Sequence, residues 1–249
     1  MSTRRRANHK KRLPIMTRRF VPFFTILVLV VAGLATPLGA RDVQSRRFLP
    51  ANQVDMAALV PPPPAVGSPA FKEQMTVVLW LQRTRTPAQI EFVREELDVA
   101  RFASLLGGDL LEVDGIGLKR MIDSAIDEVR AEYDALKGKY DLPRPFVVND
   151  AVHPVTDNRP VASYPSGHAT RAVVHARLLA EIFPKRREAL MELAHQIGYG
   201  RVIAGVHYPV DVVAGFRLGS AFADAIIAQP AFVEAVKHIR GVATAAGGQ

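Results

Sequence analysis

Apolar residues recur at every third or fourth position through most of the chain after residue 68, and this period is typical of helices that bury one face. The longest run lies in residues 115–137 and comprises Leu118, Met121, Ile122, Ala125, Ile126, Val129, Tyr133 and Leu136. Comparable spacing predicts helices at about 68–83, 86–103, 168–183, 186–204, 210–228 and 230–239. No segment of useful length alternates as a strand would. The sequence therefore predicts an all-α fold with a single helical domain.

The charge of the chain is unevenly placed. The 249 residues have a formal net charge of +8, with 32 Lys and Arg against 24 Asp and Glu. Residues 1–40 hold eight Lys or Arg and no acid, so residues 41–249 are balanced at 24 basic and 24 acidic residues. Nucleic-acid binding needs basic residues clustered on the domain itself, so we expect no nucleic-acid partner. The absence of cysteine excludes disulfides, thiolate metal sites and cysteine nucleophiles.

The N-terminal residues have the order of an export signal. Residues 1–19 are basic, an apolar run extends from Phe20 to about Ala35, and small residues and a proline follow up to Ala40. The run is short for a bilayer span, so residues 1–40 are predicted to be a signal peptide or an uncleaved N-terminal anchor. We expect a periplasmic or secreted protein that touches the membrane only through this leader, if it is retained.

The rest of the chain divides at its prolines. Residues 41–66 contain four consecutive prolines, Pro61 to Pro64, and are predicted to form an extended arm. Residues 67–249 are predicted to be the helical domain. Within it, residues 138–166 read as a long loop, a feature that is more often functional than idle. The sequence permits a homo-oligomer but does not decide the oligomeric state.

Three short segments contain the residues that could carry chemistry. Lys137 and Arg144 flank the start of the long loop, Ser166-Gly167-His168 leads into a helix, and the segment with Arg201, His207 and Asp211 bridges two predicted helices. Phosphoryl transfer needs cations and N–H groups around a multiply charged group. Lys137, Arg144 and Arg201 supply the cations, and a helix N-terminus at Ser166-Gly167 supplies the amides.

Two histidines in these segments suit opposite roles. His207 and Asp211 stand four residues apart near Pro209, where a helix is predicted to begin, so Asp211 can orient the ring of His207 for nucleophilic attack. His168 is adjacent to the predicted phosphate cradle and is the best candidate for the general acid. Because the acid must be protonated, we expect an acidic pH optimum.

The spacing of these residues resembles a known three-part signature. Lys137 with six residues before Arg144-Pro145, then Pro165-Ser-Gly-His168, then Arg201 with His207 and Asp211, is similar to that of the type 2 phosphatidic acid phosphatase (PAP2) superfamily. Ala162-Ser-Tyr-Pro-Ser-Gly-His168 most resembles the bacterial class A non-specific acid phosphatases. The resemblance implies an all-α enzyme that hydrolyses small phosphate monoesters, needs no metal or other cofactor and forms a phosphohistidine.

The same resemblance assigns roles to residues. It implies that Lys137, Arg144, Ser166, Gly167 and Arg201 bind phosphate, that His168 is the acid, and that His207 is the nucleophile oriented by Asp211. The chain departs from the family pattern at Gly200, Ala162 and Ala169, where Ser, Gly and Thr are usual. Gly200 removes a potential hydroxyl donor to phosphate.

Other functions remain open from the sequence. A serine hydrolase using Ser166 lacks the G-x-S-x-G elbow and leaves three cations unexplained. A vanadate-dependent haloperoxidase and a membrane-associated lipid phosphatase belong to the same superfamily, and halide oxidation would identify the former. An inactive phosphate-binding protein is the non-enzymatic alternative.

Overall fold

The structure, a computed structural model, describes residues 46–156 and 158–246, and the predicted leader at 1–40 lies outside these residues. The described residues contain helices and no strands, so the all-α prediction is confirmed. The α-helices are α1 (Met56–Leu59), α2 (Pro69–Thr84), α3 (Pro87–Arg94), α4 (Ala100–Leu106), α5 (Gly115–Tyr140), α6 (Pro145–Val148), α7 (Gly167–Ile182), α8 (Arg187–Ile203), α9 (Pro209–Ile227) and α10 (Pro230–Ala246), and the 3-10 helices are η2 (Gly107–Glu112) and η3 (Pro184–Arg186).

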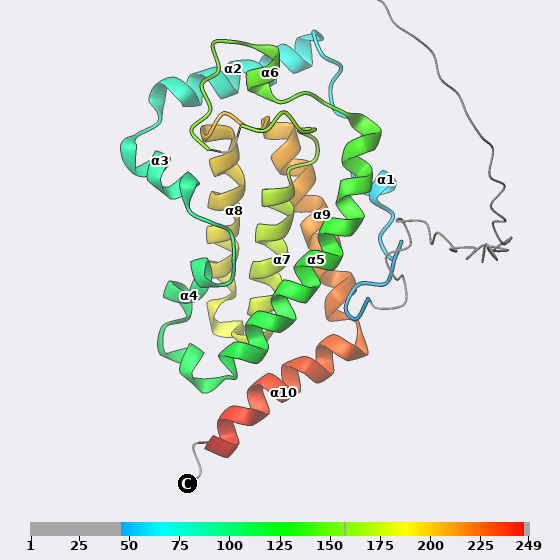
Figure 1. The fold of residues 1–249 in the computed structure, drawn as a ribbon, viewed down its shortest axis with the longest axis vertical. Coiled ribbons are helices and arrows are strands. Elements are labelled where there is room, and N and C mark those ends of the chain that lie inside the picture. Colours follow the sequence, from blue (N-terminus) through cyan, green and yellow to red (C-terminus); the bar gives the residue numbers. More distant parts are fainter. Residues whose placement is uncertain (1–45, 157, 247–249) are drawn as a thin grey trace, which may run out of the picture. The chain divides into compact units, whose positions relative to one another are not determined.

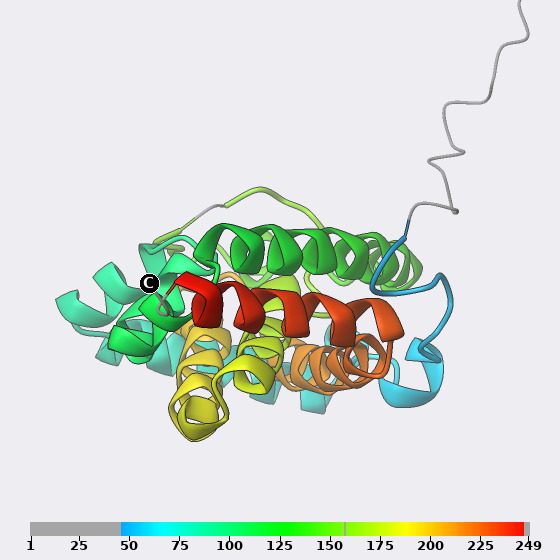
Figure 2. The ribbon, with the colours of Figure 1, turned by 90° about the horizontal axis from the view of Figure 1, so that it is seen from below.

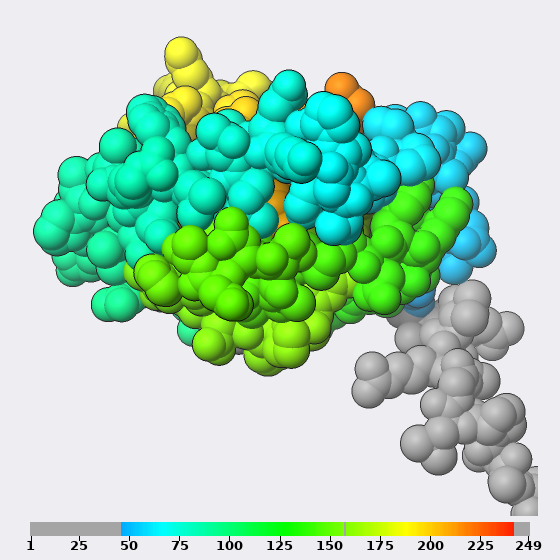
Figure 3. Space-filling model, turned by 90° about the horizontal axis from the view of Figure 1, so that it is seen from above, coloured from blue at the N-terminus to red at the C-terminus, as the bar shows by residue number. Residues whose placement is uncertain are grey.

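Helices α7, α8 and α9 form the centre of the fold and run alternately down, up and down, with α5 crossing them (Figure 1). The N-terminus of α7, the C-terminus of α8 and the N-terminus of α9 therefore meet at one end. Figure 3 shows α2, α3 and the green segment of the long loop with α6 over this end. At the opposite end α10 lies across the helices and contacts α5, α7 and α9 (Figure 2).

Helices α7 and α9 are in close contact because glycines line the seam between them. A Cβ at Gly215 would lie 2.6 Å from the carbonyl oxygen of Ser166, and one at Gly219 would lie 2.5 Å from that of Thr170. Only glycine, which has no Cβ, therefore lets the two backbones lie this close together. The backbone N–H of Ser166 also donates to the carbonyl oxygen of Asp211 across the seam, at 2.9 Å. These contacts fix two of the predicted site segments against each other.

Some predicted boundaries are wrong. The helix predicted at 86–103 is two helices, because α3 ends at Arg94 and α4 begins at Ala100. The guanidinium of Arg101 donates to the carbonyl oxygens of Phe92 (2.6 Å) and Glu95 (2.8 Å) and so satisfies the end of α3. The loop predicted at 138–166 is shorter, because α5 continues to Tyr140 and α6 occupies four of its residues.

The predicted arm is not extended throughout and is attached to the helices. It contains α1, and the side chains of Phe48, Leu49 and Val60 are buried in the main core. The carboxylate of Glu128 on α5 accepts hydrogen bonds from the backbone N–H groups of residues 47–49 at 2.6–3.0 Å. Within the described residues, no helix combines the length and apolar character that crossing a bilayer requires.

Candidate active site

The residues predicted from the sequence gather at the end where α7, α8 and α9 meet. Lys137, Arg144, Gly167, His168, Arg201 and His207 all line one cavity of about 440 Å³. The side chains of Ser166 and Asp211 are fully buried beside it. The structure thus brings together residues that are up to 74 positions apart in the sequence (137 to 211).

His207 and Asp211 are in direct contact, as their spacing predicted. The ring Nδ1 of His207 is 3.0 Å from Oδ2 of Asp211, and both side chains are buried. His207 lies in the short link between α8 and α9, which Gly205 allows to turn with a φ of +77°. Asp211 is in the first turn of α9, and its Oδ2 also accepts from the backbone N–H of Tyr208 at 2.9 Å. Because Nδ1 faces Asp211, Nε2 is the nitrogen left for the cavity.

Ser163 is a functional candidate that was not predicted. Its hydroxyl donates to the same Oδ2 of Asp211 at 2.5 Å and is 3.3 Å from Nδ1 of His207. Its side chain is fully buried, and its backbone N–H donates to the carbonyl oxygen of Leu142 at 2.7 Å. Ser163 therefore supports the carboxylate that supports His207. It lies in a loop without periodicity, so no spacing signal marked it.

The N-terminus of α7 forms the wall next to His168. Ser166 is its N-cap and accepts from the backbone N–H of Ala169 at 3.4 Å. A Cβ at Gly167 would lie 2.8 Å from the hydroxyl oxygen of Tyr133, so the backbone there lies against α5. The positive end of a helix dipole and unbonded N–H groups are suited to an anion.

The predicted cations are held by carbonyl groups. Arg144 donates from Nε to the carbonyl of Val161 at 3.0 Å and from Nη1 to that of Val206 at 2.9 Å. Lys137 donates from Nζ to the carbonyl of Ala162 at 3.1 Å. Arg201 on α8 is 7% exposed, and its Nη1 donates to the carbonyl of Val93 at 3.5 Å. Among the described residues, His, Asp and Glu side chains form no group of three or more that could hold a metal ion.

Burial, together with the nearby charges, shifts the pKa values of the titrating groups. Burial raises the pKa of Asp211 to about 6, although the hydrogen bonds from Ser163 and Tyr208 oppose this rise. Burial, with Arg144 close by, lowers the pKa of Lys137 to about 8. The pKa of His207 is held well below its usual value by burial and by Arg144 and Lys137. Burial and Arg201 lower the pKa of His168 in the same way.

Arg171 is a further cation that was not selected from the sequence. It stands three residues after His168 on α7, is 8% exposed and lines the same cavity. Tyr133 lines the cavity beside it, and exposed Arg130, Asp134 and Arg159 form the rim. The i+3 spacing from His168 was the signal that could have identified it.

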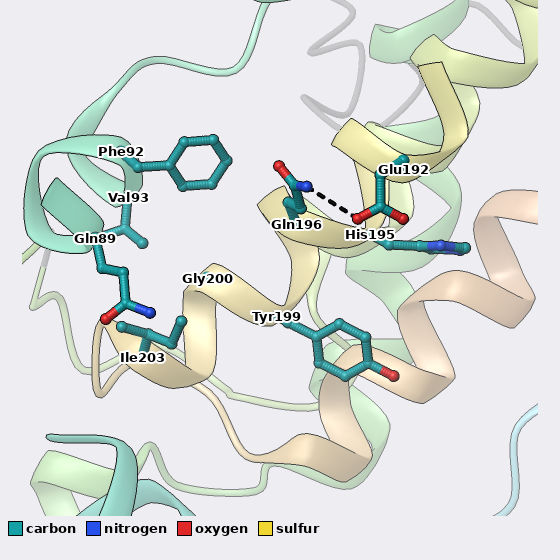
Figure 4. Close-up of a pocket in the computed structure, with 9 residues that line it drawn as sticks. All are labelled: Gln89, Phe92, Val93, Glu192, His195, Gln196, Tyr199, Gly200 and Ile203. Carbon is teal, nitrogen blue, oxygen red and sulfur yellow. Dashed lines mark hydrogen bonds between the residues drawn. The ribbon is translucent and has the colours of Figure 1, made fainter. Parts of the chain in front are cut away.

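A second cavity of about 510 Å³ lies between α3 and α8 and contains none of the predicted site residues (Figure 4). Gly200 lines it, and a Cβ there would meet Cγ1 of Val93 at 3.0 Å. The expectation that Gly200 removes a hydroxyl from the phosphate site is therefore wrong, because this position faces α3. Ala169 also points away from the phosphate site, because its Cβ packs against Gly198 on α8 and Gly215 on α9.

Comparison with known proteins agrees with the site. The family model described as the PAP2 superfamily matches residues 124–233, which extend from α5 to α10 and include every predicted site residue. Over these residues the chain is similar to the PAP2 superfamily. A non-specific acid phosphatase of Salmonella typhimurium is 27% identical over 236 residues, covering 90% of this chain and 92% of that relative.

Two further proteins are similar in part. A lipid A 1-phosphatase of Rhizobium johnstonii is 38% identical over 69 residues, which cover 28% of each chain. The crystal structure of a transmembrane PAP2-type phosphatidylglycerolphosphate phosphatase from Bacillus subtilis aligns at 18% identity with a TM-score of 0.47, covering 65% of this chain and 87% of that one.

Proposed function

We propose that the protein is an acid phosphatase that hydrolyses phosphate monoesters through a phosphohistidine on His207, without a metal ion. The observation that carries this proposal is the buried pair of His207 and Asp211, 3.0 Å apart, in a cavity that Lys137, Arg144 and Arg201 also line. The match of residues 124–233 to the PAP2 family model and relatives named acid phosphatase support the class of phosphoric monoester hydrolase.

In the first step, Nε2 of His207 attacks phosphorus and the bond from phosphorus to the ester oxygen breaks. The proton of His168 passes to the leaving oxygen, while Asp211 stabilises the positive charge on the ring of His207. In the second step, water attacks the phosphohistidine, His168 takes the proton of the water, and inorganic phosphate leaves. Lys137, Arg144, Arg201 and the α7 N-terminus stabilise the equatorial oxygens in both steps.

Because burial and nearby cations, Arg201 first among them, lower the pKa of His168, we infer that its proton arrives with the substrate. A bound phosphoryl group offsets the cations that lower this pKa, and a phosphate monoester itself loses its second proton near pH 6. Hydrolysis is therefore favoured below about pH 6, where the ester is a monoanion. Asp211, with a pKa of about 6, must be ionised to orient His207. We expect kcat/KM to peak near pH 6, and a peak at or above about pH 8 would contradict the mechanism.

We also propose a periplasmic location. It rests on the signal-like order of residues 1–40 and on enterobacterial relatives named acid phosphatase. Fractionation of cells that express the full chain tests it, and activity found only with cytoplasmic markers would contradict it.

The deciding experiment is hydrolysis of p-nitrophenyl phosphate with a chelator present. Wild type should be active and His207→Ala should lose at least about 10⁴-fold in kcat. His195→Ala is the matched control, because His195 is a histidine on α8 that lines the cavity between α3 and α8 and not the proposed active site. A denaturing quench during turnover of a substrate with a labelled phosphate should trap an acid-labile label on the wild-type protein. This label should be absent in His207→Ala. Dependence on metal, or activity that survives the loss of His207, would refute the proposal.

A further inference from the structure

Arg171 is a buried cation that the reaction described above does not use. Its Nε donates to the carbonyl oxygen of Gly167 at 3.3 Å, so the side chain bends back along α7 toward the helix N-terminus. It also interacts with the hydroxyl of Tyr133 on α5. Both partners are neutral groups.

No carboxylate of the described residues forms an ion pair with Arg171. The charged groups on α5 that act on it or feel its charge are the exposed Asp134 and two cations, Arg130 and Lys137. Burial of a guanidinium without an anion is costly. Lys137, Arg144 and Arg201 already supply the positive charge that one phosphoryl group needs, so Arg171 is in excess of that requirement.

The position of Arg171 identifies which part of a substrate it faces. It is on the same helix as His168, three residues away, and its charge is among those that depress the pKa of His168. The main charges that act on His207 come instead from Arg144, Lys137 and Arg201. Electrostatic effects decrease with distance, so Arg171 lies nearer the proposed acid than the nucleophile. In an in-line displacement, that is the side of the leaving group.

We propose that Arg171, with Arg130 at the rim, forms a second anion subsite that selects phosphate esters whose leaving alcohol carries another anionic group, a phosphate or a carboxylate. This inference rests on the proposed phosphatase function. Arg171 supplies a planar donor fork that can bind two oxygens of such a group. Arg130 is about half exposed and forms a long ion pair with Asp127 at 3.9 Å, so it can turn toward a bound anion.

Matched pairs of substrates test the subsite. Glycerol 3-phosphate and 3-phosphoglycerate differ by a carboxylate on the leaving group, and propane-1,3-diol monophosphate and bisphosphate differ by a phosphate. Wild type should prefer the anionic member of at least one pair by roughly 10- to 100-fold in kcat/KM. The pair that shows the preference distinguishes a carboxylate from a phosphate.

Variants then assign the preference to Arg171. Arg171→Met keeps a long buried side chain, and the kcat/KM ratio of the pair should fall toward one, whereas Arg171→Lys should keep part of it. Arg130→Gln, an exposed change that does not disturb the core, should lower the ratio by a smaller factor. Arg177→Met is the control, because Arg177 is on the same helix but pairs with Asp224 away from the cavity.

The outcomes separate the subsite from the proposed function. A wild-type ratio near one in both pairs, or an equal loss on both members of a pair in Arg171→Met, would overturn the subsite and leave the phosphatase intact. The equal loss would show that Arg171 binds the transferred phosphoryl group. No hydrolysis of any of these esters by wild type would overturn the phosphatase proposal and the subsite with it.

Discussion

Gly200 and Arg201 are adjacent in α8 and line two different cavities. The cavity beside Gly200 has a volume of about 510 Å³, and its lining includes Phe92, Tyr199 and Ile203 but no Lys or Arg. The cavity beside Arg201 is smaller, at about 440 Å³, and has Lys137 and several arginines in its wall. Volume alone would select the first cavity as the active site. The second contains the buried titratable groups, which mark functional sites more specifically.

The two cavities also differ in how tightly their walls are held. The charged cavity lies over the seam of α7 and α9, where glycines allow backbone contact and the N–H of Ser166 bonds Asp211. The other lies between α8 and the short helix α3, where the side chains of two lining residues on α8, Gln196 and Glu192, form a hydrogen bond at 2.9 Å (Figure 4). Precise placement of reacting groups requires the first kind of support.

The largest expected difference between the cavities concerns Arg201. Arg201→Met removes a charge from the proposed phosphate site while keeping the side-chain length. We expect kcat/KM for p-nitrophenyl phosphate to fall by about 10²- to 10³-fold, because one preorganised donor to a developing charge contributes that much. Gln196→Met is the control: it introduces a methionine on the part of α8 that lines the other cavity. It should change kcat/KM by less than about twofold. Similar losses in the two variants would refute the distinction between the cavities.

The next effect concerns the glycine seam. Gly215→Ala places a Cβ 2.6 Å from the carbonyl of Ser166, so α7 and α9 must separate. We expect the free energy of unfolding in urea to fall by about 1–3 kcal/mol. Gly138→Ala is the control: Gly138 is exposed in α5 with nothing near its Cβ position, and the change should raise stability by about 0.5–1 kcal/mol. If Gly215→Ala were stabilising to the same degree, the close packing described here would be wrong.

A smaller effect is expected at Ser163. Loss of its hydroxyl removes a hydrogen bond that favours the ionised form of Asp211, so Ser163→Ala should raise the pKa of Asp211 above about 6. The acid limb of the kcat/KM profile then moves to higher pH, and the peak falls by about tenfold. In an Asp211→Asn background the same change should add little, because the two residues act together. Additive losses with an unmoved acid limb would show that Ser163 acts elsewhere.

Much of the fold follows from local sequence. Apolar spacing predicted a helix at 115–137 and the structure has α5 at Gly115–Tyr140, because that pattern requires no knowledge of partners. The break between α3 and α4 depends on where the side chain of Arg101 donates, and apolar spacing contains no such information. The attachment of Phe48 and Leu49 through Glu128 joins residues about 80 positions apart, which a local pattern also cannot show.

The candidate site divides in a similar way. The spacing of His207 and Asp211 predicted their contact because Pro209 begins a helix between them. Ser163 lies within the segment from Ala162 to His168 that resembles the family signature, but a loop has no period to place its side chain, so its contact with Asp211 was not predicted. The direction in which Gly200 faces could have been predicted from the sequence. Successive helix residues point about 100° apart, so Gly200 and the adjacent Arg201 cannot both face the phosphate site.

The smallest expected effect tests that last point. Gly200→Ser restores the residue usual in the family pattern, and a hydroxyl in the phosphate site would be expected to alter kcat/KM. In this structure the new Cβ faces Val93 at 3.0 Å, in the cavity between α3 and α8. We therefore expect kcat/KM to change less than about threefold, and stability to change little, because the gain in helix propensity offsets the tight contact. Gly200→Ala is the matched control without the hydroxyl. A rate for Gly200→Ser well above that of Gly200→Ala would show that the hydroxyl reaches the substrate and that α8 is rotated relative to the arrangement described here.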